Sequence, residues 1–240
     1  MNAAESSRAA TAAPSLDLLV LTGTAIVVAL ALGIASPDTP PATRLLLAVA
    51  TPVLLVPLLA GEGTRTSTAL AACIAGWLGS TLLLGVAAIL FGARPASAQL
   101  APLLLVALGI VVVTRLAASA MTRLLQAAGL QTPAAREWAR WLAAAILWLL
   151  AAAPLWLGPL AALGADAGPA RSSAIVATSP LVHLGVAAGQ DLLRTQWWYA
   201  HTSFGSLQFD YPSLSTIAWA YVATALVLAA LNFVIKEPAR

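Results

Sequence analysis

The chain has 240 residues, of which 60% are hydrophobic and only 9% are charged. A soluble domain carries about 25% charged residues, so the composition excludes a water-soluble globular protein and indicates that lipid surrounds the chain. The net charge of +3 is scattered between apolar segments, which argues against nucleic acid as a partner. The single cysteine, Cys73, excludes an internal disulfide and a cysteine metal cluster.

The pattern of apolar segments predicts an all-α, polytopic transmembrane helical bundle of about six spans, with amphipathic helices at the membrane interface. Residues 1–15 are expected to form a flexible cytoplasmic tail, and residues 16–240 a single transmembrane domain. A spanning helix needs about 20 mostly apolar residues. The segments that meet or approach this length are Leu18–Ala35, Leu45–Ala60, Ala69–Phe91, Ala96–Thr114, Trp141–Leu163 and Ile217–Ile235.

The first two spans each leave an alternative open. The apolar run that ends at Ala35 is longer than the 7–15 residues of a signal-peptide core, so we interpret it as a span and keep a cleaved signal as the alternative. The second span is short and contains Pro52 and Pro57, which free backbone carbonyls that a neighbouring helix must satisfy. It is either a broken or tilted helix in the bundle or half of a re-entrant pair.

The cations predict that both termini lie in the cytoplasm, because positive charge is enriched on that side of a membrane. With that orientation eight cations lie inside and four outside. The inside set is Arg8, Arg65, Arg115, Arg123, Arg136, Arg140, Lys236 and Arg240, and the outside set is Arg44, Arg94, Arg171 and Arg194. The middle of each predicted span carries no ionisable residue, which disfavours a proton-driven carrier and a bundle that holds haem through histidines.

The segment between the fourth and fifth spans is predicted to form a basic helical hairpin. Gly129 is suited to end the first helix, and Thr132-Pro133 is suited to start the second as N-cap and first helical residue. The two interpretations are a hairpin at the lipid headgroups and a docking surface for a cytoplasmic partner. The docking residues of the second interpretation are Arg115, Arg123, Arg136 and Arg140.

The connection from Gly164 to Thr216 is predicted to lie outside the cell and to contain structure, because long unstructured loops are uncommon. Ser179-Pro180 is expected to start a helix that runs to about Arg194 and lies on, or dips into, the outer membrane surface. Its polar side would comprise His183, Gln190, Asp191 and Arg194, the last two spaced for an ion pair.

An aromatic segment follows, made of Trp197, Trp198, Tyr199 and His201. Such residues anchor a chain at the headgroups, and the alternative is a binding platform for a lipid or glycan. Leu207–Tyr211 alternates apolar and polar residues and is expected to form a short strand. We find no phosphate-binding loop, nucleophile elbow or metal motif, so we expect no catalytic residue, no metal, no cofactor and no enzymatic activity.

The layout of the spans, with the segment Ser179-Pro180-Leu181-Val182-His183-Leu184 continuing to Asp191-Leu192-Leu193-Arg194, resembles the membrane subunit of type-2 ABC exporters. The resemblance covers most of the chain by topology and about 16 residues by sequence. It implies a permease half that pairs with a second membrane subunit and a cytoplasmic ATPase. Family members usually contact the ATPase through a helix before the first span or between the second and third. This chain lacks both, so the basic hairpin is expected to substitute.

Three hypotheses follow for the function of this inner-membrane protein. The first is a permease subunit of an ABC-type transport system with a separate ATPase. The second is a non-transporting structural subunit or assembly factor of a larger membrane complex. The third is a membrane enzyme that acts on lipid or glycan at the outer surface through the region from His183 to Asp210.

Overall fold

The computed structural model describes residues 40–59, 66–90, 92–93, 97–162, 169–195, 204 and 207–235. Within these ranges the chain is helical and forms no strand, which confirms the all-α class. The helices are α3 (Pro41–Leu59), α4 (Thr66–Leu90), α5 (Ser97–Ala127), α6 (Thr132–Ala151), α7 (Ala153–Ala162), α8 (Pro169–Thr178), α9 (Pro180–Ala187) and α11 (Leu214–Val234).

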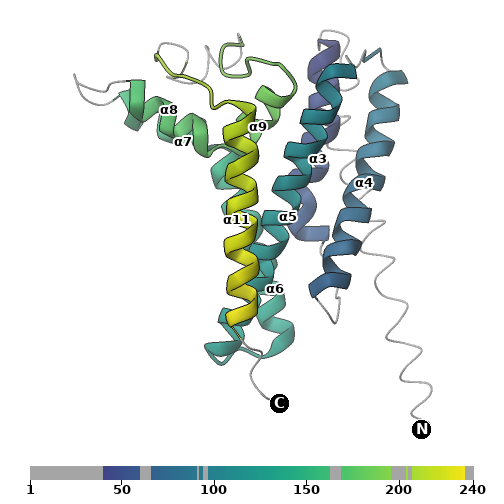
Figure 1. Cartoon of the computed structure of the whole chain (residues 1–240), viewed down its shortest axis with the longest axis vertical. Coiled ribbons are helices and arrows are strands. Elements are labelled where there is room, and N and C mark those ends of the chain that lie inside the picture. Colours follow the sequence, from purple (N-terminus) through teal and green to yellow (C-terminus); the bar gives the residue numbers. More distant parts are fainter. Residues whose placement is uncertain are drawn as a thin grey trace.

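Helix α5 forms the centre of the bundle, and α3, α4, α6, α9 and α11 all pack against it (Figure 1). The shared core is built from leucine, valine and alanine side chains of these helices, with Trp77 as its largest fully buried residue. Gly109 lets α11 approach α5 closely, because a Cβ atom at this position would lie 3.1 Å from the Cβ of Tyr221. The turn between α5 and α6 projects past the ends of α3 and α4 at one end of the bundle (Figure 1).

Three helices are long and apolar enough to cross a membrane: α4, α5 and α11. The bent pair of α6 and α7 would be a fourth if it counts as one span. The third and sixth predicted spans thus correspond to α4 and α11 with small shifts at their ends. Helix α3 covers most of the second predicted span, but its apolar stretch, Thr43–Leu55, is shorter than a spanning helix needs. The first predicted span lies outside the described residues.

The outward faces of these helices are apolar. Trp219 and Phe233 of α11 are 72% and 87% exposed, and Leu90 of α4 is 80% exposed. Leaving one such side chain in water instead of an apolar medium costs about 1.5–3 kcal/mol, and soluble monomers rarely expose large apolar patches. The exposed faces therefore fit a lipid bilayer around the bundle.

The helix that contains the fourth predicted span is longer than that span. Helix α5 continues without interruption from Ser97 to Ala127, well past the predicted end at Thr114. Gly129 then takes a φ of +94°, a left-handed conformation that suits glycine, and ends the first arm of the hairpin as predicted. The second helix begins at Thr132 with Gln131, and not Thr132, as its N-cap.

The fifth predicted span, expected as one helix, is broken at Ala152, and α6 and α7 meet there at an angle of 51°. Pro154 lies in the first turn of α7, where its missing N–H is tolerated, whereas it would disrupt a continuous helix. Side chains satisfy carbonyls near the break. The indole of Trp156 donates to the Leu149 carbonyl at 2.9 Å, and the Ser179 hydroxyl donates to the Ala151 carbonyl at 2.9 Å.

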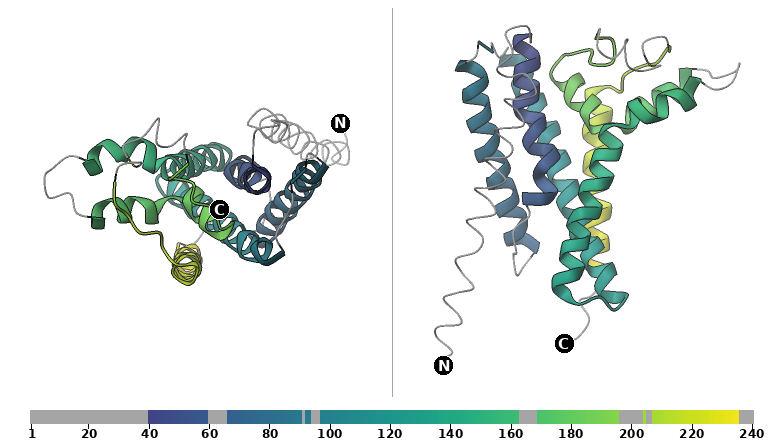
Figure 2. Two further views of the ribbon diagram at one scale, coloured as in Figure 1. Left: turned by 90° about the horizontal axis from the view of Figure 1, so that it is seen from above. Right: turned by 180° about the vertical axis from the view of Figure 1, so that it is seen from behind.

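Beyond the break, α7 and α8 form a pair of antiparallel helices that points away from the bundle at the end where α11 begins (Figures 1 and 2). Helix α9 then returns to the bundle and packs against α3, α5, α6 and α11. The break at Ala152 and the return of α9 together place a short buried helix beside the central helix α5, where the candidate site lies.

Candidate functional site

A cavity of about 230 Å³ lies where α5, α6, α9 and α11 meet. Most of its lining is aliphatic, with five polar side chains from four different segments. The lining residues are Ile110, Val113, Thr114, Ala117, Met121, Ala143, Ile146, Leu147, Leu150, Thr178, Pro180, His183, Ala220, Tyr221 and Thr224. A concave apolar space with a few convergent polar groups is the usual form of a small-molecule site.

His183 and Tyr221 form the polar end of the cavity. The Nε2 atom of His183 lies 3.0 Å from the Ala177 carbonyl, and since a carbonyl only accepts, Nε2 carries the proton. The Nδ1 atom then accepts a hydrogen bond of 2.9 Å from the Tyr221 hydroxyl. The two rings also meet edge to face at 5.6 Å. Burial lowers the pKa of His183, so the neutral ring that this geometry requires is favoured.

The predicted position of His183 on a surface helix is therefore wrong, because the side chain is only 7% exposed and lies inside the bundle. The predicted length of that helix is also wrong. Ser179 is the N-cap as expected, accepting from the Val182 N–H, but α9 ends at Ala187. Gly189 takes a φ of +66°, and the Gln190 N–H donates to the Gly185 carbonyl at 2.8 Å, which closes the helix.

Gln190, Asp191 and Arg194 consequently leave the helix and lie in the turn that follows it. Thr43 of α3 donates to the Gln190 side chain at 3.2 Å. Asp191 and Arg194 form the predicted ion pair, at 3.6 Å, although the two residues are exposed and not helical. The Tyr211 hydroxyl donates to Asp191, and burial together with this carboxylate raises the pKa of Tyr211.

The segment after this turn packs over α8 and α9 as a small second core of Val176, Val182, Leu193, Phe204 and Phe209. Residues 207–211 form no strand; the Gln208 carbonyl and the Asp210 N–H bond to side chains of α8 instead. The alternation of apolar and polar residues in this segment reflects its packing, because Phe209 is buried and Asp210 is exposed. The aromatic residues Trp197, Trp198, Tyr199 and His201 lie outside the described residues.

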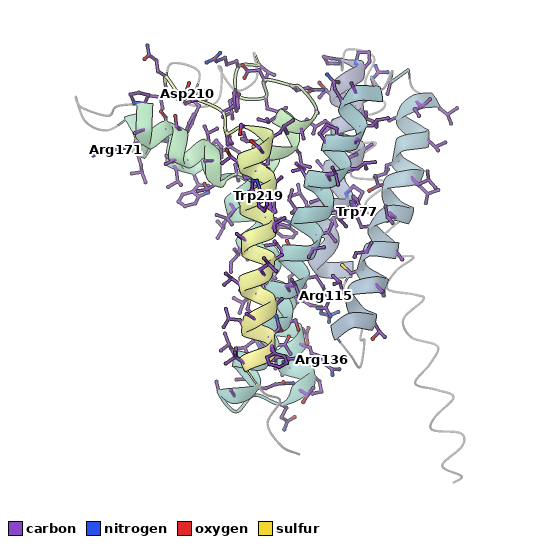
Figure 3. The ribbon with its side chains drawn as sticks, viewed as in Figure 1. Trp77, Arg115, Arg136, Arg171, Asp210 and Trp219 are labelled. Atoms are coloured by element: carbon purple, nitrogen blue, oxygen red, sulfur yellow. The ribbon has the colours of Figure 1, made fainter. Side chains whose placement is uncertain are left out.

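The four arginines predicted for partner docking divide into two groups. Arg123 donates to the carbonyls of Asn232 and Ile235, at 3.0 Å for the latter, and so stabilises the carboxyl end of α11. Arg115 of α5 lies within electrostatic range of Arg136 and Arg140 of α6. Figure 3 places Arg115 above Arg136 along the hairpin arms.

We call Arg115, Arg136 and Arg140 the basic cluster. Its arginines form no hydrogen bond or ion pair within the described ranges, and the Nε atom of Arg115 is buried without a partner. Glu137, on the same helix, does not neutralise them by an ion pair in this part of the chain. The cluster therefore concentrates positive charge at the end of the bundle where α5 turns into α6, with no ion pair to an acidic residue of the described segments.

Among the site residues that the sequence did not single out are Tyr221 and Thr114. Each lies in a segment that reads as uniformly apolar, and neither belongs to a motif. Tyr221 is the one residue of α11 with an ionisable side chain, and that was the only available signal. Among the described residues no group of three or more His, Cys, Asp or Glu is arranged to hold a metal ion.

No family model, no curated protein and no solved structure matches the chain. The fold and the cavity therefore define only a broad class. The chain is an all-helical protein with apolar helices long enough to span a membrane, and it carries a mainly apolar cavity beside a broken helix.

Proposed function

We propose that the chain is the permease subunit of an ABC-type transport system. In this proposal it crosses the inner membrane about six times, with both termini in the cytoplasm. Helices α4, α5 and α11, the pair α6–α7, α3 and the predicted first span at residues 18–35 supply the six crossings. Helix α8 and the far end of α7 would then lie at the outer membrane surface.

The broken helix beside the cavity is the observation that carries this proposal. Helices that cross a membrane break where the freed backbone groups are buried in protein or line a cavity, and such breaks recur at the substrate sites of transporters. The α6–α7 break lies near Leu150 and Thr178, both of which line the cavity. A structural subunit needs neither feature.

The energy source would be a separate ATPase. The sequence contains no phosphate-binding loop of the form GxxxxGK[ST], so ATP binding of that kind requires a partner. The basic cluster lies on the two arms of the α5–α6 hairpin and suits an acidic surface on such a partner. Exposed apolar faces on α4 and α11 are suited to contact the second membrane subunit.

The test uses the tagged full chain purified from its native membrane. Reversing two charges, with Arg136→Glu and Arg140→Glu together, is expected to reduce copurification of a nucleotide-binding protein and the associated ATP hydrolysis about tenfold. A loss of about 1.4 kcal/mol in binding is sufficient for that effect. Arg171→Glu is the matched control, because Arg171 is exposed on α8 at the opposite end of the molecule (Figure 3).

Stable copurification of other membrane proteins, with no nucleotide-binding protein and no ATP hydrolysis in the wild type, would instead identify a structural subunit or assembly factor. Equal loss of ATP hydrolysis in the Arg171→Glu control would show that the effect is not specific to the hairpin, and the docking proposal would be withdrawn.

A further inference from the structure

The cavity described above is a groove along one face of α5. Its walls are α6 on one side and α11 on the other, since both helices pack against α5. Thr178, Pro180 and His183 close one end, and Met121 marks the other. The closed end is therefore at α9, and the opposite end faces the α5–α6 turn.

The rim of the groove is continuous with the apolar outer surface of the bundle. Ile146 and Leu150 of α6 line the groove and are about 40% exposed, and Ala220 and Thr224 of α11 are exposed on the other side. A hydrocarbon chain next to the protein thus reaches the groove without crossing a polar barrier formed by these residues.

The size of the groove fits one narrow chain. From Ile110 to Met121, α5 rises about 16 Å at 1.5 Å per residue, which is close to half of a hydrocarbon core about 30 Å thick. That length matches one leaflet. The volume of about 230 Å³ is below the roughly 300–1,000 Å³ of pockets for drug-sized ligands. A bulky or branched ligand is therefore disfavoured.

The polar groups of the groove select an uncharged occupant. His183 and Tyr221 bond to each other, and the hydroxyls of Thr178 and Thr224 bond to carbonyls of their own helices. Among the described polar side chains that line the groove, only the Thr114 hydroxyl, on a residue 7% exposed, has no hydrogen bond. No residue of the described segments that lines the groove carries a charge.

We propose that the groove holds one acyl chain of a membrane phospholipid. The chain lies along α5 with its methyl end near His183 and Tyr221. The glycerol and phosphate remain outside the groove at the Met121 end. This binding site does not depend on the transport proposal, because it requires neither an ATPase nor movement of the lipid.

The experiment uses the full chain in vesicles of phosphatidylglycerol that contain a trace of the same lipid with a diazirine at the end of one acyl chain. After irradiation and proteolysis, mass spectrometry locates the labelled residues. The terminal carbene is expected to label the peptides that contain His183 and Tyr221. Ala220→Phe, which fills the groove from the exposed surface of α11, is expected to reduce this labelling at least fivefold.

Ala223→Phe is the matched control, because Ala223 is exposed on α11 and does not line the groove. Labelling in this variant should equal that of the wild type. Ala117→Phe fills the groove from α5 and provides a second, independent variant with the same expected loss. No ATP or partner protein is present, so the outcome is separate from the test of the transport proposal.

Labelling could instead be uniform over all outward faces and unchanged by Ala220→Phe and Ala117→Phe. That result would report only the lipid that surrounds any membrane protein, and it would overturn the proposal. Crosslinks between two copies of the chain through α6 and α11 would also overturn it, since the groove would then be covered by protein.

Discussion

His183 and Tyr221 join two segments of the chain that approach the bundle separately. Their hydrogen bond links α9 to α11, and the second bond of His183 fixes the end of α8 through the Ala177 carbonyl. Both ring nitrogens of His183 are therefore in use, one as donor and one as acceptor. A protonated ring has two donors, so protonation would leave the Tyr221 hydroxyl to turn and accept.

This geometry predicts a stability that depends on pH. The unfolded His183 takes up a proton near pH 6.5, while burial lowers the pKa in the folded protein. The contribution of neutral His183 to the free energy of unfolding is complete above about pH 6.5. It is lost as the pH falls through the folded pKa, because the unfolded state binds more protons than the folded state between the two pKa values. Thermal unfolding in detergent from pH 7.5 to 5.0 should show this decline.

His183→Gln keeps a donor for the Ala177 carbonyl but does not titrate, so this variant should lose the part of the pH dependence that comes from His183. His201 is present in both proteins and cancels in the comparison. A wild type and a variant with parallel pH profiles would contradict the prediction.

At the scale of helices, the α6–α7 break depends on Ser179. One hydroxyl accepts from the Val182 N–H as the N-cap of α9 and donates to the Ala151 carbonyl at the end of α6. Ser179 is completely buried, so water does not replace either bond. The start of one helix and the end of another are thus fixed by the same side chain.

Ser179→Ala is expected to destabilise the protein by about 1–3 kcal/mol, because it removes an N-cap and leaves a buried carbonyl without a partner. The change should appear as a lower midpoint of thermal or dodecyl sulfate unfolding. Thr178→Ala is the matched control, since the Thr178 hydroxyl is exposed and bonds within its own turn. Equal midpoints for the two variants would rule out this role of Ser179.

At the scale of the whole molecule, the proposed orientation places the α5–α6 turn and the start of α11 on opposite sides of the membrane. Leu214 at the start of α11 and Val234 at its end are both exposed. Helix α5 runs alongside α11 between these two ends of the bundle (Figure 2). The single cysteine, Cys73, is buried, so the wild-type protein should react little with a thiol-specific label.

A membrane-impermeant maleimide is expected to label Ser215→Cys in intact cells and Gln131→Cys only after the membrane is opened. Residues 131 and 215 are both exposed, so accessibility within the protein does not limit either reaction. Labelling of both cysteines from the same side would overturn the orientation and the proposed cytoplasmic docking site with it.

The sequence alone determined the helical class, the positions of α4 and α11 and the hairpin turn at Gly129. These features depend on local chemistry: apolar composition over about 20 residues selects helices in lipid, and glycine alone takes a positive φ at little cost. The N-cap at Ser179 and the Asp191–Arg194 pair also depend on residues a few positions apart. Such short-range patterns can be identified in the sequence without knowledge of the tertiary structure.

Only the tertiary structure decided where the described parts of the connection from Gly164 to Thr216 lie and what they build. It placed His183 inside the bundle, ended α9 at Ala187, and joined Ser179 to Ala151 and His183 to Tyr221 across 28 and 38 positions of sequence. The physical reason is that a buried polar group must find a partner wherever the packed helices bring one. The sequence pattern does not indicate which group will be the hydrogen-bond partner.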